Sequence, residues 1–285
     1  MGSLPGHCAT GRDRVSDPAG GTDPAYDDGP SPLDPVPAFF DAHCHLQALP
    51  RGEVAEALDR AQAVGVMRMV CCATSEADWA AVLALASGHS QIIPMLGLHP
   101  WKATEARSDW EARLEALLVQ HRAGIGECGL DFARRPLDRA AQVSVFRQHL
   151  RLAAKLHRPL AIHCVRAWGA LKTILSEEGL PPAGAMVHAF GGSAETAREL
   201  QDLGLLLSLS GRQLAPIASS GPVALAAVHD DHLLLESDAP GPSASEPAAL
   251  PLLAEAAAVR RGCSPAHLAE ITRRNAESLF EEILA

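Results

Sequence analysis

The sequence of 285 residues is poor in aromatic side chains, which make up 4% of it and include a single tyrosine. No apolar run approaches the roughly 20 residues that span a bilayer, so we expect no membrane-spanning helix. Basic residues are also in deficit, with 24 Lys and Arg against 34 Asp and Glu and a formal net charge of −10. This balance argues against a broad basic surface that coats nucleic acid, although an enzyme that neutralises phosphates with bound cations stays compatible with it.

Cysteine spacing excludes two further classes of protein. The seven cysteines are an odd number, and Cys71 and Cys72 are adjacent. This pattern does not suit a disulfide framework and indicates a reducing compartment, which we take to be the cytoplasm. No Cys-x-x-Cys pair is present, so nothing in the sequence supports a structural zinc site.

Residues 1–37 differ in composition from the rest of the chain. They contain no Phe or Trp and are rich in Gly, Pro and Asp. Such a segment buries too little apolar surface to offset the entropy of ordering it, which predicts a disordered tail. It also lacks the apolar stretch behind a basic start that marks a secretory signal. We therefore expect one folded domain, at residues 38–285.

From residue 38 onward, short apolar runs alternate with segments whose apolar residues recur at helical spacing. The runs predict strands at residues 39–45, 66–73, 92–99, 124–131, 160–165, 185–190, 205–210 and 232–238. The other segments predict helices at 53–63, 77–86, 110–121, 139–157, 168–178, 194–203, 222–228, 248–261 and 265–284. This α/β alternation predicts a (β/α)8 TIM barrel. A doubly wound sheet is the alternative, but no glycine-rich phosphate loop follows the first strand.

Residues of metal-ligand type stand at the ends of five predicted strands. They are His43, His45, Glu127, His163, His188 and Asp238. The carboxyl ends of barrel strands meet at one mouth, and the two-residue spacing of His43 and His45 points both imidazoles the same way. A lone histidine at a strand end is more often a core residue than a ligand, but this shared position predicts a binuclear site for divalent ions.

The remaining histidines and the cysteines support this site less directly. His99 ends the third predicted strand at the same mouth, where a substrate contact and a structural cap are equally good interpretations. Histidines in the predicted helices, among them His149, are expected on the solvated surface. Cys44, Cys128 and Cys164 each follow a proposed ligand and should therefore face the helices as small buried side chains.

Six short motifs follow one another along the chain: Asp41-Ala-His43-Cys-His45, Gly97-Leu-His99-Pro100, Gly126-Glu127-Cys-Gly-Leu-Asp131, Ile162-His163, Val187-His188-Ala-Phe and Glu236-Ser-Asp238-Ala-Pro. In this order they resemble the motifs of the TatD family of metal-dependent deoxyribonucleases. Asn275-Ala-x-x-Leu-Phe280 is similar to the closing helix motif of that family. The resemblance covers about residues 38–285 and implies a TIM barrel of the amidohydrolase-like superfamily that hydrolyses phosphodiesters with two divalent ions.

The resemblance also implies a role for each matching residue. His43, His45 and Asp238 would hold one ion, His163 and His188 the other, and Glu127 would bridge them. Two segments depart from the family pattern. His163 is followed by Cys-Val-Arg166-Ala, without the usual acidic residue, and Asp238-Ala-Pro continues as Gly-Pro-Ser-Ala-Ser. Arg166 is still expected to contact phosphate.

Phosphodiester hydrolysis requires charge neutralisation on both the attacking and the leaving oxygen, which a pair of cations supplies. Asp238 is the natural group to orient the attacking water and take its proton, whereas His99 and Arg166 are expected to bind the other phosphate oxygens. Trp101 and Phe132 have two interpretations, loop packing and base stacking, of which packing is preferred. Arg134 and Arg135 are read as solvated, with phosphate guidance as the alternative.

The leading functional hypothesis is a deoxyribonuclease, in particular an exonuclease acting on single-stranded DNA or 3′ ends, with Mg, Mn or Zn as the metal. The alternatives are a hydrolase of a small amide, lactone or phosphoester, and a catalytically silent scaffold whose acidic tail recruits a partner. A basic rim around the mouth would favour the nuclease, and a closed apolar pocket the small-molecule hydrolase. No protein partner is inferable from the sequence.

Overall fold

The computed structural model describes residues 37–50, 52–134, 136–214, 225–241, 244 and 246–284. The predicted tail lies outside the described residues except for Pro37. Eight parallel strands follow one another in sequence order around a single sheet. They are β1 (Phe39–Cys44), β2 (Val66–Cys72), β3 (Ile92–Leu96), β4 (Gly124–Asp131), β5 (Leu160–Val165), β6 (Ala185–Val187), β7 (Leu206–Leu209) and β8 (Leu233–Leu235).

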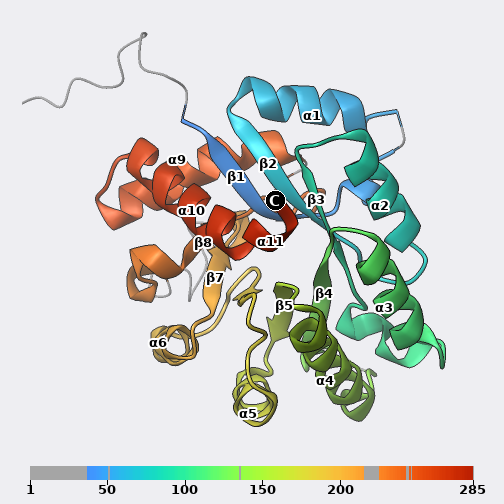
Figure 1. The fold of residues 1–285 in the computed structure, drawn as a ribbon. Helices are drawn as coiled ribbons and strands as arrows, with labels where there is room; N and C mark the ends of the chain where they lie inside the picture. Colours follow the sequence, from blue (N-terminus) through green and yellow to red (C-terminus); the bar gives the residue numbers. More distant parts are fainter. Residues whose placement is uncertain are drawn as a thin grey trace, which may run out of the picture. The chain divides into compact units, whose positions relative to one another are not determined.

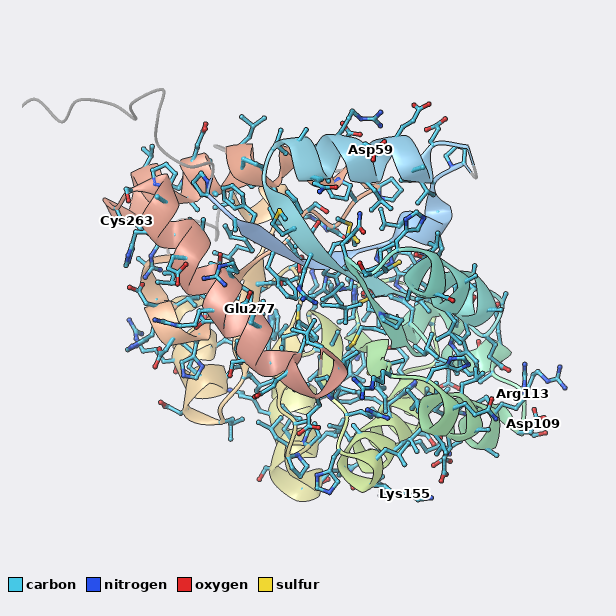
Figure 2. All side chains as sticks on the ribbon, turned by 45° about the horizontal axis from the view of Figure 1, so that its top comes forward. Asp59, Asp109, Arg113, Lys155, Cys263 and Glu277 are labelled. Atoms are coloured by element: carbon cyan, nitrogen blue, oxygen red, sulfur yellow. The ribbon has the colours of Figure 1, made fainter. Side chains whose placement is uncertain are left out.

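Helices connect the strands and lie around them (Figure 1). They are α1 (Val54–Ala63), α2 (Trp79–Gly88), α3 (Trp110–Gln120), α4 (Arg139–Leu156), α5 (Trp168–Glu178), α6 (Ala194–Asp202), α7 (Gly211–Leu214), α9 (Leu250–Arg261), α10 (Pro265–Leu279) and α11 (Glu281–Leu284). Short 3-10 turns add η1 (Leu46–Ala48), η2 (Pro100–Glu105), η3 (Asp230–His232) and η4 (Pro247–Ala249). Charged side chains such as Asp59 and Lys155 point outward from these helices (Figure 2).

Hydrogen bonds between the ends of β8 and β1 bring the last strand back to the first. The backbone N–H of Asp238 donates to the carbonyl of His43 at 3.0 Å, and that of His45 to the carbonyl of Ala239 at 2.6 Å. The parallel sheet therefore curls into a nearly closed ring, as a TIM barrel requires. The predicted (β/α)8 barrel is confirmed.

Two apolar layers hold the barrel together. One lies between the strands and the helices and includes Cys44, Cys128 and Cys164, as predicted for residues that alternate with the proposed ligands. The other fills the inside of the barrel. Its amino end is closed by α10 and α11, where the ring of Phe280 stacks on that of Phe40 with centroids 5.9 Å apart (Figure 1).

Helix ends follow local capping chemistry that the sequence carries. Asp138 caps α4 by accepting from the N–H groups of Ala140 and Ala141, and Ser264 caps α10 ahead of Pro265. Among the described residues, no helix is long and apolar enough to cross a membrane.

Several strands end earlier than the sequence predicts. β3, β6 and β8 stop at Leu96, Val187 and Leu235, so His99, His188 and Asp238 lie on the loops that follow. The backbone turns sharply there, with positive φ at Ala189 and at Asp238. The apolar run alone could not reveal this turn, because the side chains stay buried after the ladder of strand hydrogen bonds has ended. The helix predicted at 222–228 is described only from residue 225, and residues 225–227 are helical.

Candidate active site

Glu127 on β4 lies between two pairs of histidines at the carboxyl end of the barrel. Its Oε1 is 2.7 Å from Nδ1 of His163 and 2.7 Å from Nε2 of His188. Its Oε2 is 3.5 Å from Nε2 of His43 and 3.4 Å from Nε2 of His45. One carboxylate oxygen therefore faces each pair.

The two imidazoles within each pair are also close. Nε2 of His43 and Nε2 of His45 are 3.1 Å apart, and Nδ1 of His163 and Nε2 of His188 are 3.0 Å apart. Asp238 completes the cluster from the loop after β8, with Oδ1 3.7 Å from Nε2 of His45. The structure thus brings all six predicted ligands to one place.

Local irregularities in β1 and β4 place these side chains. The pairing register shifts between Asp41 and Cys44 on β1 and between Ile125 and Cys128 on β4, so each strand has one more residue than its partner. Such bulges re-aim side chains, and here each irregular stretch contains a proposed ligand, His43 on β1 and Glu127 on β4. A strict period of two, which the sequence analysis assumed for His43 and His45, does not describe this backbone.

Gly129 allows β4 and β5 to approach each other behind the cluster. A Cβ at this position would lie 2.1 Å from the carbonyl oxygen of His163, and its φ of +138° is one that side chains rarely adopt. Only glycine fits such a close approach of two backbones. The contact fixes the height of His163 relative to Glu127.

Two buried acids that the sequence analysis did not single out support the histidines. Oε1 of Glu236 is 3.4 Å from Nδ1 of His188 and accepts from the N–H of Ala189 at 2.8 Å, while Oε2 accepts from the hydroxyl of Ser208. Asp41 accepts from the N–H of His43 at 3.3 Å and that of Ser237 at 2.8 Å. In the sequence, both acids interrupt apolar runs that predict strands, and this could have marked them as functional residues.

The pKa values of the side chains in the cluster are shifted by burial and by the neighbouring ionisable groups. Burial, together with the neighbouring His188, lowers the pKa of His43 to about 4. Burial acts to raise the pKa of Glu127, but the charges of His188 and His99 and hydrogen bonds from the imidazoles hold that pKa well below its usual range. Glu127 is thus an anion whose side chain is almost inaccessible to solvent.

These donors fit divalent metal ions. Four imidazoles and two carboxylates converge here, with Nε2 of His43 facing Nε2 of His45 at 3.1 Å and Nδ1 of His163 facing Nε2 of His188 at 3.0 Å. Nitrogen lone pairs that face one another inside a protein are costly unless a cation lies between them. Histidine with carboxylate is a ligand set used for Zn, Mn and related ions.

A cavity of about 580 Å³ opens above the cluster. It is lined by ligand residues and by Trp101, Lys102 and Arg212, and Trp101 is 41% exposed. Lys102, in η2, and Arg212, in α7, were missed because these short helical turns leave no periodic pattern in the sequence and charged residues are common between strands. Arg166 is exposed beside this cavity but is not among its lining residues, so its phosphate contact stays a prediction.

His99 lies against the cluster, but its two ring nitrogens have different partners from those of the proposed ligands. Its Nδ1 accepts from the backbone N–H of Trp101 at 3.2 Å, and its Nε2 is 3.4 Å from Oε1 of Glu127. Since Nδ1 accepts, the proton of the neutral ring sits on Nε2, which then faces the cavity as a donor. This tautomer suits a contact to an anion better than a bond to a metal.

His149 corrects one expectation from the sequence. It was expected on the solvated surface, but it is fully buried on α4. Its Nδ1 is 2.8 Å from the carbonyl of Val145, and its Nε2 accepts from the N–H of Leu98 at 3.2 Å. It therefore anchors the loop that carries His99. Helical spacing alone did not reveal that this face of α4 packs on the β3 loop.

Comparison with known proteins identifies the family. The family described as TatD related DNase matches residues 40–281. The chain belongs to the TatD family. As a TatD protein it is a metal-dependent hydrolase, which confirms the predicted resemblance and enzyme class.

Individual TatD relatives extend the comparison. The chain is 35% identical over 244 residues to the 3′-5′ ssDNA/RNA exonuclease TatD of Cronobacter sakazakii, covering 79% of this chain and 90% of that protein. It is 30% identical over 251 residues to the uncharacterized metal-dependent hydrolase YabD of Bacillus subtilis, covering 85% and 98%. The crystal structure of YjjV, a TatD homologue from Escherichia coli, superimposes with a TM-score of 0.81 at 28% identity, covering 85% and 98%.

Proposed function

We propose that this TatD protein is an exonuclease that hydrolyses the phosphodiester bonds of single-stranded DNA with two divalent ions. The observation that carries the proposal is the position of Glu127, which presents one carboxylate oxygen to each histidine pair. The name of the Cronobacter relative, a 3′-5′ ssDNA/RNA exonuclease, supports the same substrate class and suggests attack from 3′ ends.

Each ion has its own set of ligands in this proposal. His43, His45 and Asp238 would hold one ion and His163 and His188 the other, and Glu127 would contribute one carboxylate oxygen to each. When bound, two such ions, whether Mg, Mn or Zn, offset charge on the attacking and leaving oxygens and bring the pKa of a water toward neutrality.

The protein's own side chains bind the phosphate and take up the proton of the attacking water. The side chain of Asp238 is 25% exposed and reaches the cavity beside His45, where its carboxylate accepts the proton of the attacking water. The Nε2–H of His99 donates to a non-bridging phosphate oxygen. Lys102 and Arg212 on the cavity wall, and Arg166 beside it, attract the phosphate backbone.

The lining of the cavity favours a polyanion over a small neutral substrate. Besides the carboxylates of Glu127, Asp131 and Asp238, the cavity wall carries Arg212, a half-open tryptophan and Lys102, which pairs with Glu105. An amide or lactone hydrolase would be expected to enclose its substrate in an apolar pocket. A small phosphoester stays the second candidate, because the same cations would attract it. The buried, unpaired thiols of β1, β2, β4 and β5 suit the reducing cytoplasm, where we place the protein.

Single-stranded oligonucleotides labelled at the 5′ or the 3′ end test the proposal. Metal-stripped protein receives Mg, Mn or Zn, beside an Asp238→Asn control. We expect a metal-dependent ladder that the control lacks, and the label that is released first gives the polarity. Tight binding of two ions without cleavage of either strand end would reject the nuclease in favour of a small phosphoester substrate.

A further inference from the structure

A second cationic surface lies next to the active-site cavity, on the segment that joins β4 to α4. The guanidinium of Arg134 lies 4.1 Å from the ring centroid of Trp101, which lines the cavity. The guanidinium of Arg139 lies 4.6 Å from the ring centroid of Phe132 and donates to the carbonyl of Phe132 at 3.4 Å. Two arginine–aromatic pairs thus follow one another outward from the cavity.

The segment that carries these pairs is held at both ends. The Oδ1 of Asp131 accepts from the N–H groups of Ala133 and Arg134 at 2.8 and 3.2 Å. The amide of Gln142 pairs with both the N–H and the carbonyl of Asp131, at 2.8 and 3.1 Å. At the other end, Asp138 caps α4. Arg134 therefore stands on a backbone that is already positioned.

The charges of this surface are available to an external anion. Farther along α4, Arg147 and Arg151 pair with Glu178, and Lys155 pairs with Glu115. Among the described residues, no carboxylate forms an ion pair with Arg134 or Arg139. The Arg and Lys residues farther along α4 thus pair with carboxylates, whereas Arg139 at its start and Arg134 before it form no such pair among the described residues.

The position of Arg139 is unfavourable for the helix itself. Arg139 is the first residue of α4, where the helix dipole favours negative charge. A cation there costs stability, whereas an anion bound at the same place gains from both the dipole and the guanidinium. Arg134 and Arg139 also line one hollow of about 460 Å³ with Pro136, Leu137 and Asp138. Asp138 is the only acid among those lining residues, and its carboxylate is engaged as the cap of α4.

We propose that Arg134 and Arg139, backed by Trp101 and Phe132, bind the phosphate backbone of the single strand where it leaves the active-site cavity. Guanidinium groups held flat on aromatic rings are suited to pair with phosphates and to let bases stack nearby. The surface makes the enzyme favour a strand of several nucleotides over a mononucleotide ester. This inference rests on the proposed nuclease function.

The experiment compares Arg134→Ala/Arg139→Ala with a matched variant that removes two cations elsewhere. Arg68 and Arg122 line a hollow at the amino ends of the strands, together with Ile283 and Leu284, so Arg68→Ala/Arg122→Ala is the control. Each protein is assayed on a single-stranded 15-mer and on bis(4-nitrophenyl) phosphate. Binding of a labelled 15-mer to metal-stripped protein is followed by fluorescence anisotropy over a series of salt concentrations.

We expect Arg134→Ala/Arg139→Ala to lower kcat/KM for the 15-mer about tenfold or more and to leave the small ester unchanged. For this variant, the plot of log affinity against log salt concentration should be less steep by about 1.4. Each phosphate contact to a single strand contributes about 0.7 to the steepness, and two contacts are removed. The control should match the wild type. Unchanged affinity for the 15-mer, or equal loss on both substrates, would overturn this binding surface. Failure of the wild type to cleave any oligonucleotide would instead overturn the nuclease function.

Discussion

Glu236 and His188 form a carboxylate–imidazole pair directly behind the candidate metal centre. Oε1 of Glu236 lies 3.4 Å from Nδ1 of His188, and both side chains are buried. A carboxylate at Nδ1 keeps the proton on that nitrogen and leaves Nε2 free to face Glu127. The Ser208 hydroxyl and the N–H of Ala189 hold Glu236 in this position.

Replacing Glu236 with Gln should therefore weaken metal binding without unfolding the barrel. The amide can still accept from Ala189 but no longer provides the charge that fixes the tautomer of His188. We expect a loss of about 10- to 100-fold in metal affinity, measured by competition with a chromogenic chelator. Glu195→Gln, the same substitution at an exposed position in the first turn of α6, serves as control. Unaltered affinity in Glu236→Gln would show that His188 needs no such support.

His99 should contribute to catalysis and not to metal content. Its Nε2–H is directed toward Glu127, and its Nδ1 is occupied by Trp101. Loss of one donor to a developing charge costs about 10²- to 10³-fold in kcat. His99→Ala should show this loss while retaining the metal content of the wild type by mass spectrometry of the intact protein. A variant that also loses an ion would identify His99 as a ligand.

His149 should make the fold sensitive to mild acid. Burial lowers its pKa from 6.5 to about 4, so between these values the unfolded chain binds a proton that the folded chain does not. The free energy of unfolding consequently falls as the pH drops through this window, by about 1.4 kcal/mol for each pH unit.

Urea titrations at pH 6.5 and pH 5 of the wild type and of His149→Gln measure this contribution. We expect the wild type to lose about 1.6 kcal/mol more than the variant between the two pH values, because the unfolded imidazole is already half protonated at pH 6.5. His121→Gln, which removes an exposed imidazole, should behave as the wild type. Parallel pH profiles for the wild type and His149→Gln would contradict the assignment.

Gly129→Ala should be among the most damaging single-methyl additions in the chain. The new Cβ meets the carbonyl of His163, which is backbone and cannot move aside without separating β4 from β5. We expect a loss of several kcal/mol in stability, at the upper end of what overpacking costs, together with reduced metal binding. A methyl group added at Gly169 on α5 would meet nothing within 4 Å, so Gly169→Ala should stabilise by about 0.5–1 kcal/mol. Thermal unfolding by circular dichroism compares the two.

The fold and the grouping of the proposed ligands at one mouth were predictable because both follow from the order of strands along the chain. The strands of a parallel barrel all end at one mouth. A polar residue at the end of an apolar run can therefore be placed near the other strand ends from the sequence alone. That reasoning located His43, Glu127 and His163. It also located His188 and Asp238, although these two lie on loops and not on strands.

The remainder depends on contacts between segments far apart in sequence. The bulges in β1 and β4 result from pairing with β2 and β5, and no local pattern distinguishes them. Burial of His149 depends on how α4 meets the loop before η2. Trp101 was preferred as a packing residue, but its 41% exposure at the cavity became visible only once β3 and β4 were paired.

The segment that fills the amino end of the barrel comes late in the chain. Ala276, Leu279, Phe280 and Ile283 pack inside the ring against side chains of β1, β2 and β3. While the protein is being synthesised, all eight strands leave the ribosome before these residues do, and the inner layer cannot be completed without them. Closure of the barrel, and with it the alignment of the ligands across β1 and β8, is therefore deferred until this segment has emerged.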